Sequence, residues 1–428
     1  LALDEACSLG ADQAEVAASQ DMGLSATARL GDVENLEFTN DRGLGITVYK
    51  DKCKGNASTS DISHAAIKET VAKAFSFARL TAEDSHSGLA DADRMATNIL
   101  DLDLDHPWEI SATEAIALAI ESETAALAFD KRISNSEGAT VGTNRGTRAY
   151  GNTHGFMGSY SKSSHSVTCV VLAESDGTMQ RDYEYTWSRV PGDLEDAAAV
   201  GRKAAEKTLK RLGARKLKTR NAPVLFVPEL ARGFLGHAIS AIAGGAQYRR
   251  SSFLLDAIGQ KIFPDFIQIQ ERPHILRGVA SRSYDGEGVA TYDRDIVSDG
   301  VLQSYVLSSY SARRLGLETT ANAGGTQNLL IPGSETDLSQ LTADMGTGLI
   351  VEELIGHGVN AVTGDYSRGV VGHWVENGEI QYPVHEVTIA GNLLDLYQRI
   401  AAVGNDQDLR SGIRCGSLLV EEMTIAGA

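Results

Sequence analysis

Hydrophobic and polar positions in the first fifty residues follow one short helical pattern and then a strand-like alternation. The segment Leu1–Gln20 begins with helical spacing and gives way to a strand around Glu15–Ala17. Residues Leu24–Tyr49 alternate between apolar and polar side chains, which is typical of half-buried strands. The alternation predicts a β-hairpin, and Asp41–Gly43 supplies turn-forming residues at or near its tip.

Two later stretches repeat apolar residues every three or four positions and therefore predict helices. The first covers residues 62–80, with Ser60 or Asp61 as its expected N-cap. The second covers residues 111–129 and opens with Ser-Ala-Thr-Glu at Ser111–Glu114. This string is a capping box, in which the serine and the glutamate satisfy each other's backbone N–H groups.

The middle of the chain contains a region of strands, a helix and a candidate domain boundary. Ile133–Thr186 reads as short strands separated by Gly, Asn and Ser turns. Leu194–Leu212 has helical spacing and ends at Gly213, a common helix stop. The basic and polar segment 214–221 predicts a linker, and the apolar run 222–228 after it predicts a buried strand bounded by prolines.

The second half is rich in glycine placed between short apolar runs. Asn377-Gly378 separates two such runs and predicts a type I′ hairpin, because that turn needs two residues with positive φ. The chain of 428 residues is long enough for two or three domains. We therefore expect an α+β protein, with an N-terminal helix-and-sheet domain at 1–218 and a mainly antiparallel β C-terminal domain at 219–428.

Composition narrows the functional classes. The chain has 39 basic and 57 acidic residues, which gives a net charge of −18. The densest basic run, Arg202–Arg220, has helical spacing and a polar tail and is typical of a solvated helix face followed by a linker. Because such an acidic chain repels phosphate and has no basic stripe with aromatics, we expect no direct binding of nucleic acid.

Cysteines and apolar runs indicate the compartment. The four cysteines lie far apart and form no CxxC pair, as expected in a reducing environment. No apolar run approaches the roughly 20 residues of a membrane span, so we predict no membrane segment. The first residues have neither a basic start nor a long apolar centre, so they are no signal peptide, and the missing initiator Met suggests a trimmed N-terminus. These patterns predict a cytoplasmic protein.

Motifs for known catalytic chemistry are sparse. No Gly-x-Ser-x-Gly elbow occurs, since Gly158–Ser161 lacks the second glycine, and nucleotide-binding glycine motifs are also absent. His357, His373 and His385 lie among several carboxylates and are weak metal-site candidates, without the short spacing that ligand pairs usually have. His237 stands on an apolar helical stretch, where a histidine usually packs against the core.

Several strings of the chain together resemble the TldD/PmbA family, which includes proteins called modulators of DNA gyrase. The block Met345–Leu394 is similar to the C-terminal signature of its PmbA (TldE) branch. Further similar strings occur in the same order along the chain, at 151–155, 180–186, 248–256 and 309–317. The resemblance implies a protein connected with proteolysis.

The resemblance also implies where the family's metal chemistry would lie. In the TldD branch a helix carries HExxxH, whose histidines bind a metal that lowers the pKa of a bound water, while the glutamate acts as general base. Aligned on that motif, this chain has Gly236, His237 and Ala241. The family's cysteine ligand corresponds to Cys415. We therefore expect no metal on this chain.

Without its own metal site, the chain is expected to provide a peptide-binding surface, while a partner subunit supplies catalysis. The resemblance implies a hetero-oligomer with a TldD-type homologous subunit that holds zinc, and a homodimer in its absence. Unfolded or extended peptides are the expected substrates, and the partnership is also expected to mature certain peptide antibiotics. Candidate peptide contacts lie just after the helix, where a strand edge could pair with peptide backbone: Gly244, Gly245, Tyr248, Arg249 and Arg250.

Two other functions stay open from the sequence. One is an autonomous peptidase that uses an unrecognised site with His237 or Cys415. The other is a non-proteolytic regulator that binds gyrase or a toxin–antitoxin protein.

Overall fold

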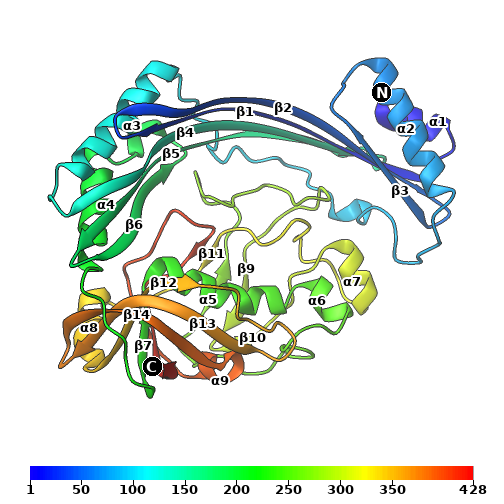
Figure 1. Ribbon diagram of the computed structural model, residues 1–428. Coiled ribbons are helices and arrows are strands. Elements are labelled where there is room, and N and C mark those ends of the chain that lie inside the picture. Colours follow the sequence, from blue (N-terminus) through cyan, green and yellow to red (C-terminus); the bar gives the residue numbers. More distant parts are fainter. Residues whose placement is uncertain (428) are drawn as a thin grey trace.

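An arched six-stranded sheet lies over a second, more compact domain in the computed structural model, which describes residues 1–427 (Figure 1). The strand order is β3-β2-β1-β4-β5-β6, and all neighbours are antiparallel. The strands are β1 (Gln13–Arg29), β2 (Asp32–Lys50), β3 (Cys53–Thr59), β4 (Ile133–Asn152), β5 (Met157–Ser175) and β6 (Thr178–Ser188). The α+β class predicted from the sequence is confirmed.

The strands of the arch are longer than the sequence pattern indicated. The predicted turn at Asp41–Gly43 is wrong, because these residues lie inside β2 and pair with Ser19–Asp21 of β1. The hairpin turns at Leu30–Gly31, where both residues have positive φ and glycine adopts it without strain. The short strands expected over Ile133–Thr186 are instead three long strands whose internal glycines and serines do not end them.

Helices cover the convex face of the arch at its two ends (Figure 1). They are α1 (Ala2–Ser8), α2 (His64–Ala78), α3 (Ala112–Leu127) and α4 (Ala197–Lys210). The α3 capping box of Ser111 and Glu114 is confirmed. The expected cap of α2 at Ser60 or Asp61 is wrong: Ser63 caps the helix, and Asp61 accepts the Ser63 N–H at 2.8 Å.

The C-terminal domain is built on two sheets that are mainly antiparallel, as expected. The larger has the order β14-β13-β12-β7-β17-β15, and β14 also pairs with β17, which closes five of its strands into a ring. Its strands are β7 (Arg220–Phe226), β12 (Gly348–Ile355), β13 (Asp365–Glu376), β14 (Glu379–Asn392), β15 (Ile400–Val403) and β17 (Leu418–Ala426). The predicted hairpin turn is confirmed, with φ of 54° at Asn377 and 77° at Gly378.

A smaller sheet and five helices complete this domain. The sheet contains β8 (Ile269–Glu271), β9 (Arg294–Ser298), β10 (Val301–Leu302), β11 (Leu329–Leu330) and β16 (Ile413–Arg414). The helices are α5 (Pro228–Ala241), α6 (Gly244–Tyr248), α7 (Ser309–Leu315), α8 (Leu338–Met345) and α9 (Leu393–Gln398). None of the helices in the described chain, residues 1–427, is long and apolar enough to cross a membrane.

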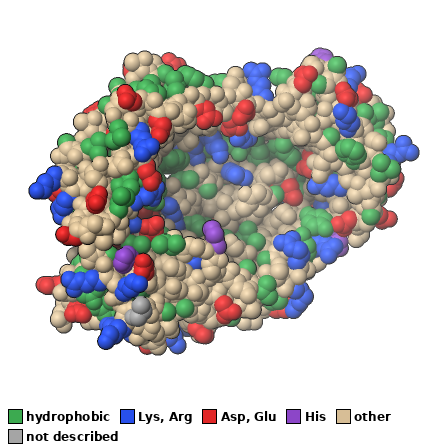
Figure 2. Space-filling view, in the orientation of Figure 1, with side chains coloured by type: hydrophobic (Ala, Val, Ile, Leu, Met, Phe, Trp, Pro, Cys, Tyr) green, Lys and Arg blue, Asp and Glu red, His purple; other side chains and the backbone are tan. Residues whose placement is uncertain are grey.

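The arch contacts the C-terminal domain at both of its ends. At one end Arg211, after α4, forms an ion pair with Glu353 of β12. At the other end Tyr310 of α7 donates a hydrogen bond to Asp84 at 2.7 Å, and Arg313 donates to the Leu89 carbonyl at 2.6 Å. Figure 2 shows the surface hollowed between these two contact regions, with Lys and Arg side chains inside the hollow.

Candidate functional site

Helix α5 follows directly from the buried strand β7 and presents two different faces. Pro228 occupies the first turn, where its missing N–H leaves no hydrogen bond unmade. Phe234 and Leu235 are fully buried in the core, and Tyr397 donates a hydrogen bond to the Phe234 carbonyl at 3.0 Å. The other face, which includes Gly233 and His237, lines a cavity of about 990 Å³ that we call the α5 cleft.

Ion pairs line one wall of the α5 cleft, and the pair of Arg410 with Glu184 joins the two domains. Arg410 contacts Glu184 of β6, Asp408, and Glu229 of α5. The Lys207 ammonium of α4 lies 2.5 Å from the same Glu184 carboxylate. Burial alone would raise the pKa of Glu184, but the Lys207 ammonium outweighs burial, and the pKa of Glu184 is lowered. These carboxylates are therefore engaged by cations of the chain itself.

The three positions that match the metal motif do not form a ligand set. Gly236 is half-buried, and a Cβ added there would approach only the Ile413 Cδ1 atom, at 3.8 Å. Ala241 is buried in the core. His237 packs edge-on against Tyr366 with ring centroids 6.0 Å apart, and burial together with the Arg368 charge lowers its pKa. One neutral imidazole remains on this face of α5.

Cys415 lies in the core close to β16 and is held as a thiol. Its side chain is fully buried, and Sγ donates to the Gly416 carbonyl at 3.2 Å. Burial raises the pKa of this thiol to about 12. Because metals bind the thiolate, a cysteine in this state is a poor ligand.

The structure places the other three candidate histidines in different surroundings. His357 is exposed on the connection between β12 and β13, and His385 lies half-buried on β14. His373 of β13 is buried, with Nδ1 3.0 Å from Glu352 Oε2 and Nε2 3.1 Å from the Lys210 carbonyl oxygen. Burial alone would lower the pKa of His373, but the Glu352 carboxylate outweighs it and the pKa is raised.

The residues present do not fit a catalytic zinc ion, which needs about three protein ligands and an open position. Within residues 1–427 no group of three or more His, Cys, Asp or Glu side chains is arranged to hold a metal. The α5 cleft instead offers paired charges and one imidazole, which suits binding of a polar chain better than activation of water.

The segment after α5 is helical and offers no strand edge. Gly244 is buried in α6, where a Cβ would lie 2.3 Å from Ser311 Oγ, so its glycine serves close packing on α7. Tyr248 has the Arg249 guanidinium 5.2 Å from its ring centroid. Arg250 is exposed and lies 3.5 Å from Asp256. The strand edge expected at this segment is therefore wrong, and peptide contact at Gly245, Tyr248, Arg249 and Arg250 stays a prediction.

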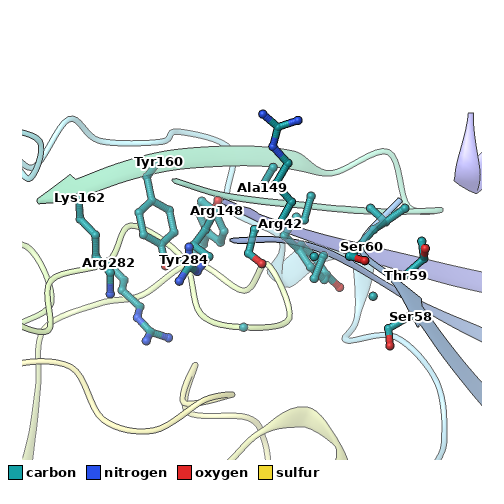
Figure 3. A pocket seen from close by; sticks show the side chains of 18 of the residues that line it. Arg42, Ser58, Thr59, Ser60, Arg148, Ala149, Tyr160, Lys162, Arg282 and Tyr284 are labelled. Carbon is teal, nitrogen blue, oxygen red and sulfur yellow. The ribbon is translucent and has the colours of Figure 1, made fainter. Parts of the chain in front are cut away.

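A second cavity of about 800 Å³ lies under the arch and was not foreseen from the sequence. It runs across the concave face from β3 to β5, and residues 282–286 of the C-terminal domain border it; we call it the cross-strand groove. Figure 3 shows Lys162, Arg282, Arg148 and Tyr160 near one end and Ser58–Ser60 at the other. The available signal was the period-two placement of Arg148 with Tyr150, and of Tyr160 with Lys162, on adjacent strands.

Comparison with known protein families finds three consecutive matches. Residues 14–78 match the PmbA/TldA metallopeptidase domain 1, residues 105–212 the central domain, and residues 219–427 the C-terminal domain.

Curated relatives carry names from the same family. The chain is 51% identical over 416 residues to Metalloprotease PmbA of Escherichia coli O157:H7, covering 97% of this chain and 92% of the relative. Haemophilus influenzae has a Metalloprotease PmbA homolog that is 48% identical, with the same shares covered. It also has a Metalloprotease TldD homolog that is 23% identical over 60% of each chain.

Solved structures share the whole fold. A crystal structure from Bacteroides thetaiotaomicron, named as a modulator of DNA gyrase, superposes with a TM-score of 0.95 at 28% identity and covers 100% of this chain and 97% of that one. TldE from Thermococcus kodakarensis has a TM-score of 0.86 at 19% identity, with 100% of both chains covered. The second likeness concerns the fold alone.

Proposed function

The chain belongs to the TldD/PmbA metallopeptidase family, and from that premise we propose that it is the TldE-like subunit of a two-component peptidase. In this proposal the chain binds unfolded or extended peptide and completes the chamber, while a TldD-type homologue supplies zinc and the general base. The complex degrades or processes peptides, including precursors of peptide antibiotics.

The observation that carries this proposal is the composition of helix α5 at the wall of the α5 cleft. Gly236, His237 and Ala241 stand where an HExxxH motif would need two ligands and a base, and Cys415 is buried as a thiol. A glycine and an alanine have no atom that can ligate zinc. Catalysis in the family's manner therefore has to come from another subunit.

A free strand edge supports the binding of extended peptide. β3 pairs only with Leu44–Lys50 of β2. In the part of the chain that the structure describes, residues 32–43 of β2 therefore have a strand partner, β1, on one side only. The exposed side chains of Leu36 and Phe38 lie on this stretch. An unpaired edge with apolar side chains can take up a peptide or a homologous strand through main-chain hydrogen bonds that are indifferent to sequence.

The proposed partner is a homologue, and the proposed setting is the cytoplasm. Haemophilus influenzae has relatives with PmbA-type and TldD-type names, which fits two subunits of common descent. Two similar chains can meet through a pseudo-symmetric interface, so a homodimer is expected when the TldD-type chain is missing. Direct contact with nucleic acid or membrane has no part in this proposal, given the net charge of −18.

Reconstitution tests the proposal. Cleavage of an unfolded peptide is measured with the purified chain, with a TldD-type subunit, and with the mixture at matched total concentration. We expect no cleavage by this chain and an increase on mixing that is greater than the partner's own activity. Cleavage by this chain alone would support an autonomous peptidase. Copurification with gyrase or a toxin–antitoxin protein, without cleavage in the mixture, would support a regulator instead.

A further inference from the structure

The cross-strand groove has unpaired positive charge at one end. The Lys162 ammonium and the Arg282 guanidinium form no hydrogen bond or ion pair with any residue of the described chain, although both side chains are at most half-exposed. Figure 3 shows both near Tyr160 and Tyr284 at the same end of the groove. A protein with a net charge of −18 has many carboxylates available, so cations left without one indicate a place for an external anion.

The acidic side chains near these two cations, Asp21 and Asp285, are already engaged. Asp21 accepts a hydrogen bond from Arg148 at 2.8 Å. Asp285 accepts the backbone N–H groups of Ala323 at 2.9 Å and Val289 at 3.0 Å. Burial lowers the pKa of Lys162, and three neighbouring guanidiniums lower it further. A bound carboxylate would offset this repulsion.

A buried hydroxyl at the same end also lacks a partner. Tyr284 is 4% exposed, and its hydroxyl has no hydrogen-bond partner within residues 1–427. Its ring packs edge-on against Phe156 and Tyr160, with centroid distances of 5.1 and 6.0 Å. Aromatic walls beside unpaired donors suit a ligand that carries an apolar body next to its anionic group.

The floor of the groove consists of small residues. Ala17 and Ser19 of β1 and Gly43 and Gly45 of β2 lie between the cationic end and Ser58 of β3. Small side chains let another backbone approach closely. From β3 to β5 the groove crosses four strand spacings, about 19 Å, which about six residues of extended peptide would span.

We propose that the cross-strand groove binds an extended peptide across the strands and that Lys162 and Arg282 hold a carboxylate of this peptide. The carboxylate is either the C-terminus or an acidic side chain near it. The length and the apolar walls of the groove favour a peptide over a small inorganic anion. This inference rests on the proposed function, because it assigns the peptide of that function to a definite surface.

Calorimetric titration of the purified full chain with unlabelled, N-acetylated six-residue peptides tests the groove. Three forms are compared: a free C-terminal carboxylate, a C-terminal amide, and an amide with aspartate as its last residue. We expect the free acid to bind at least about tenfold more tightly than the plain amide, since a charge-assisted hydrogen bond is lost. Tight binding of the aspartate amide would assign the site to side-chain carboxylates as well.

Variants test which residues of the cross-strand groove contact the peptide. Lys162→Met is expected to fold, because the ammonium loses no partner, and to reduce the preference for the free acid about tenfold. Lys131→Met is the matched control: this exposed lysine forms no ion pair in the described chain and does not line the groove, so affinity should not change. Gly45→Ile fills the floor, where a Cβ would meet nothing nearer than the Ala17 carbonyl oxygen at 3.9 Å, and should weaken all three peptides.

The outcomes separate this inference from the proposed function. Equal binding of all three peptides to the wild type, or an unchanged preference in Lys162→Met, would overturn the groove assignment. Cleavage in the reconstituted mixture is read separately. Normal complementation without carboxylate preference rejects only the groove, whereas cleavage by the chain alone rejects the subunit proposal and leaves the titration result standing.

Discussion

The buried His373 and the half-buried Glu352 form a pair whose contribution to stability depends on pH. The pKa of His373 is raised in the folded chain, so the pair contributes its full stability below the unfolded pKa and loses it as pH rises through the folded pKa. Glu352→Gln should therefore lower the free energy of unfolding by about 1 kcal/mol below pH ~6.5, since solvent screens the part-exposed Glu352, with a smaller effect at higher pH. Urea unfolding between about pH 5.5 and 8.5 measures this difference.

The control for this pair is Glu379→Gln, which removes an exposed carboxylate that has no ion pair in the described chain. Its effect should be small and independent of pH over the same range. A constant difference between wild type and Glu352→Gln across the range would contradict the assigned role of His373.

His237 is expected to be a packing residue. It is half-buried and contacts Tyr366. Its position in the chain aligns with the glutamate that acts as general base in the family's HExxxH motif. His237→Gln should change cleavage by the reconstituted complex by less than about threefold, because a true acid–base residue contributes about 10²- to 10⁴-fold. Steady-state kinetics of the complex measure this change, and a hundredfold loss of kcat would make His237 part of the chemistry.

At the scale of elements, the β13–β14 turn requires glycine for two reasons. Gly378 has a φ of 77°, and a Cβ there would lie 3.0 Å from the Ala343 Cα atom of α8. Gly378→Ala should cost about 2 kcal/mol in the free energy of unfolding, from backbone strain and from the contact. Gly356→Ala, with a φ of 79° and no neighbour within 4 Å, should show the strain alone, about 1 kcal/mol. Equal losses would contradict the packing argument.

Arg410 joins the arch to the C-terminal domain. It contacts Glu184 of β6 and Asp408, both largely buried, and it lies 4.2 Å from the ring centroid of Tyr185. Arg410→Met should lower the free energy of unfolding by about 2 kcal/mol, because Glu229 loses its cation while Glu184 and Asp408 keep only Lys207 and Arg232. Hydrogen exchange should increase first in β6.

Arg399→Met is the matched control for Arg410. Arg399 forms an ion pair with Glu422, and both side chains are exposed. This pair should contribute less than about 1 kcal/mol to the free energy of unfolding. A similar loss in both variants would mean that the Arg410 contacts do not connect the domains.

At the scale of the whole molecule, local signals predicted the elements better than they predicted the sites. The α3 capping box and the Asn377-Gly378 turn depend only on residues close together in the chain, so the sequence alone was enough to predict both. The hairpin turn after β1 was misplaced because alternation continues through Asp41–Gly43 and does not mark where a strand ends. The two-domain division at 218/219 stays a prediction.

The cross-strand groove could not be predicted because its parts are distant in sequence. Lys162 and Arg282 come together only when the C-terminal domain packs under the arch. The segment from Gly244 was misjudged for a related reason: its glycine permits close packing of α6 on α7, and the sequence does not distinguish this use from an approach by peptide.

The metal content of the purified subunits tests the central claim most directly. Mass spectrometry of the metals in this chain, in the TldD-type subunit and in their complex should find zinc at about one ion per complex, all of it contributed by the partner. The chain alone should stay free of bound zinc after exposure to the metal and removal of the excess. Stoichiometric zinc on this chain alone would contradict the account.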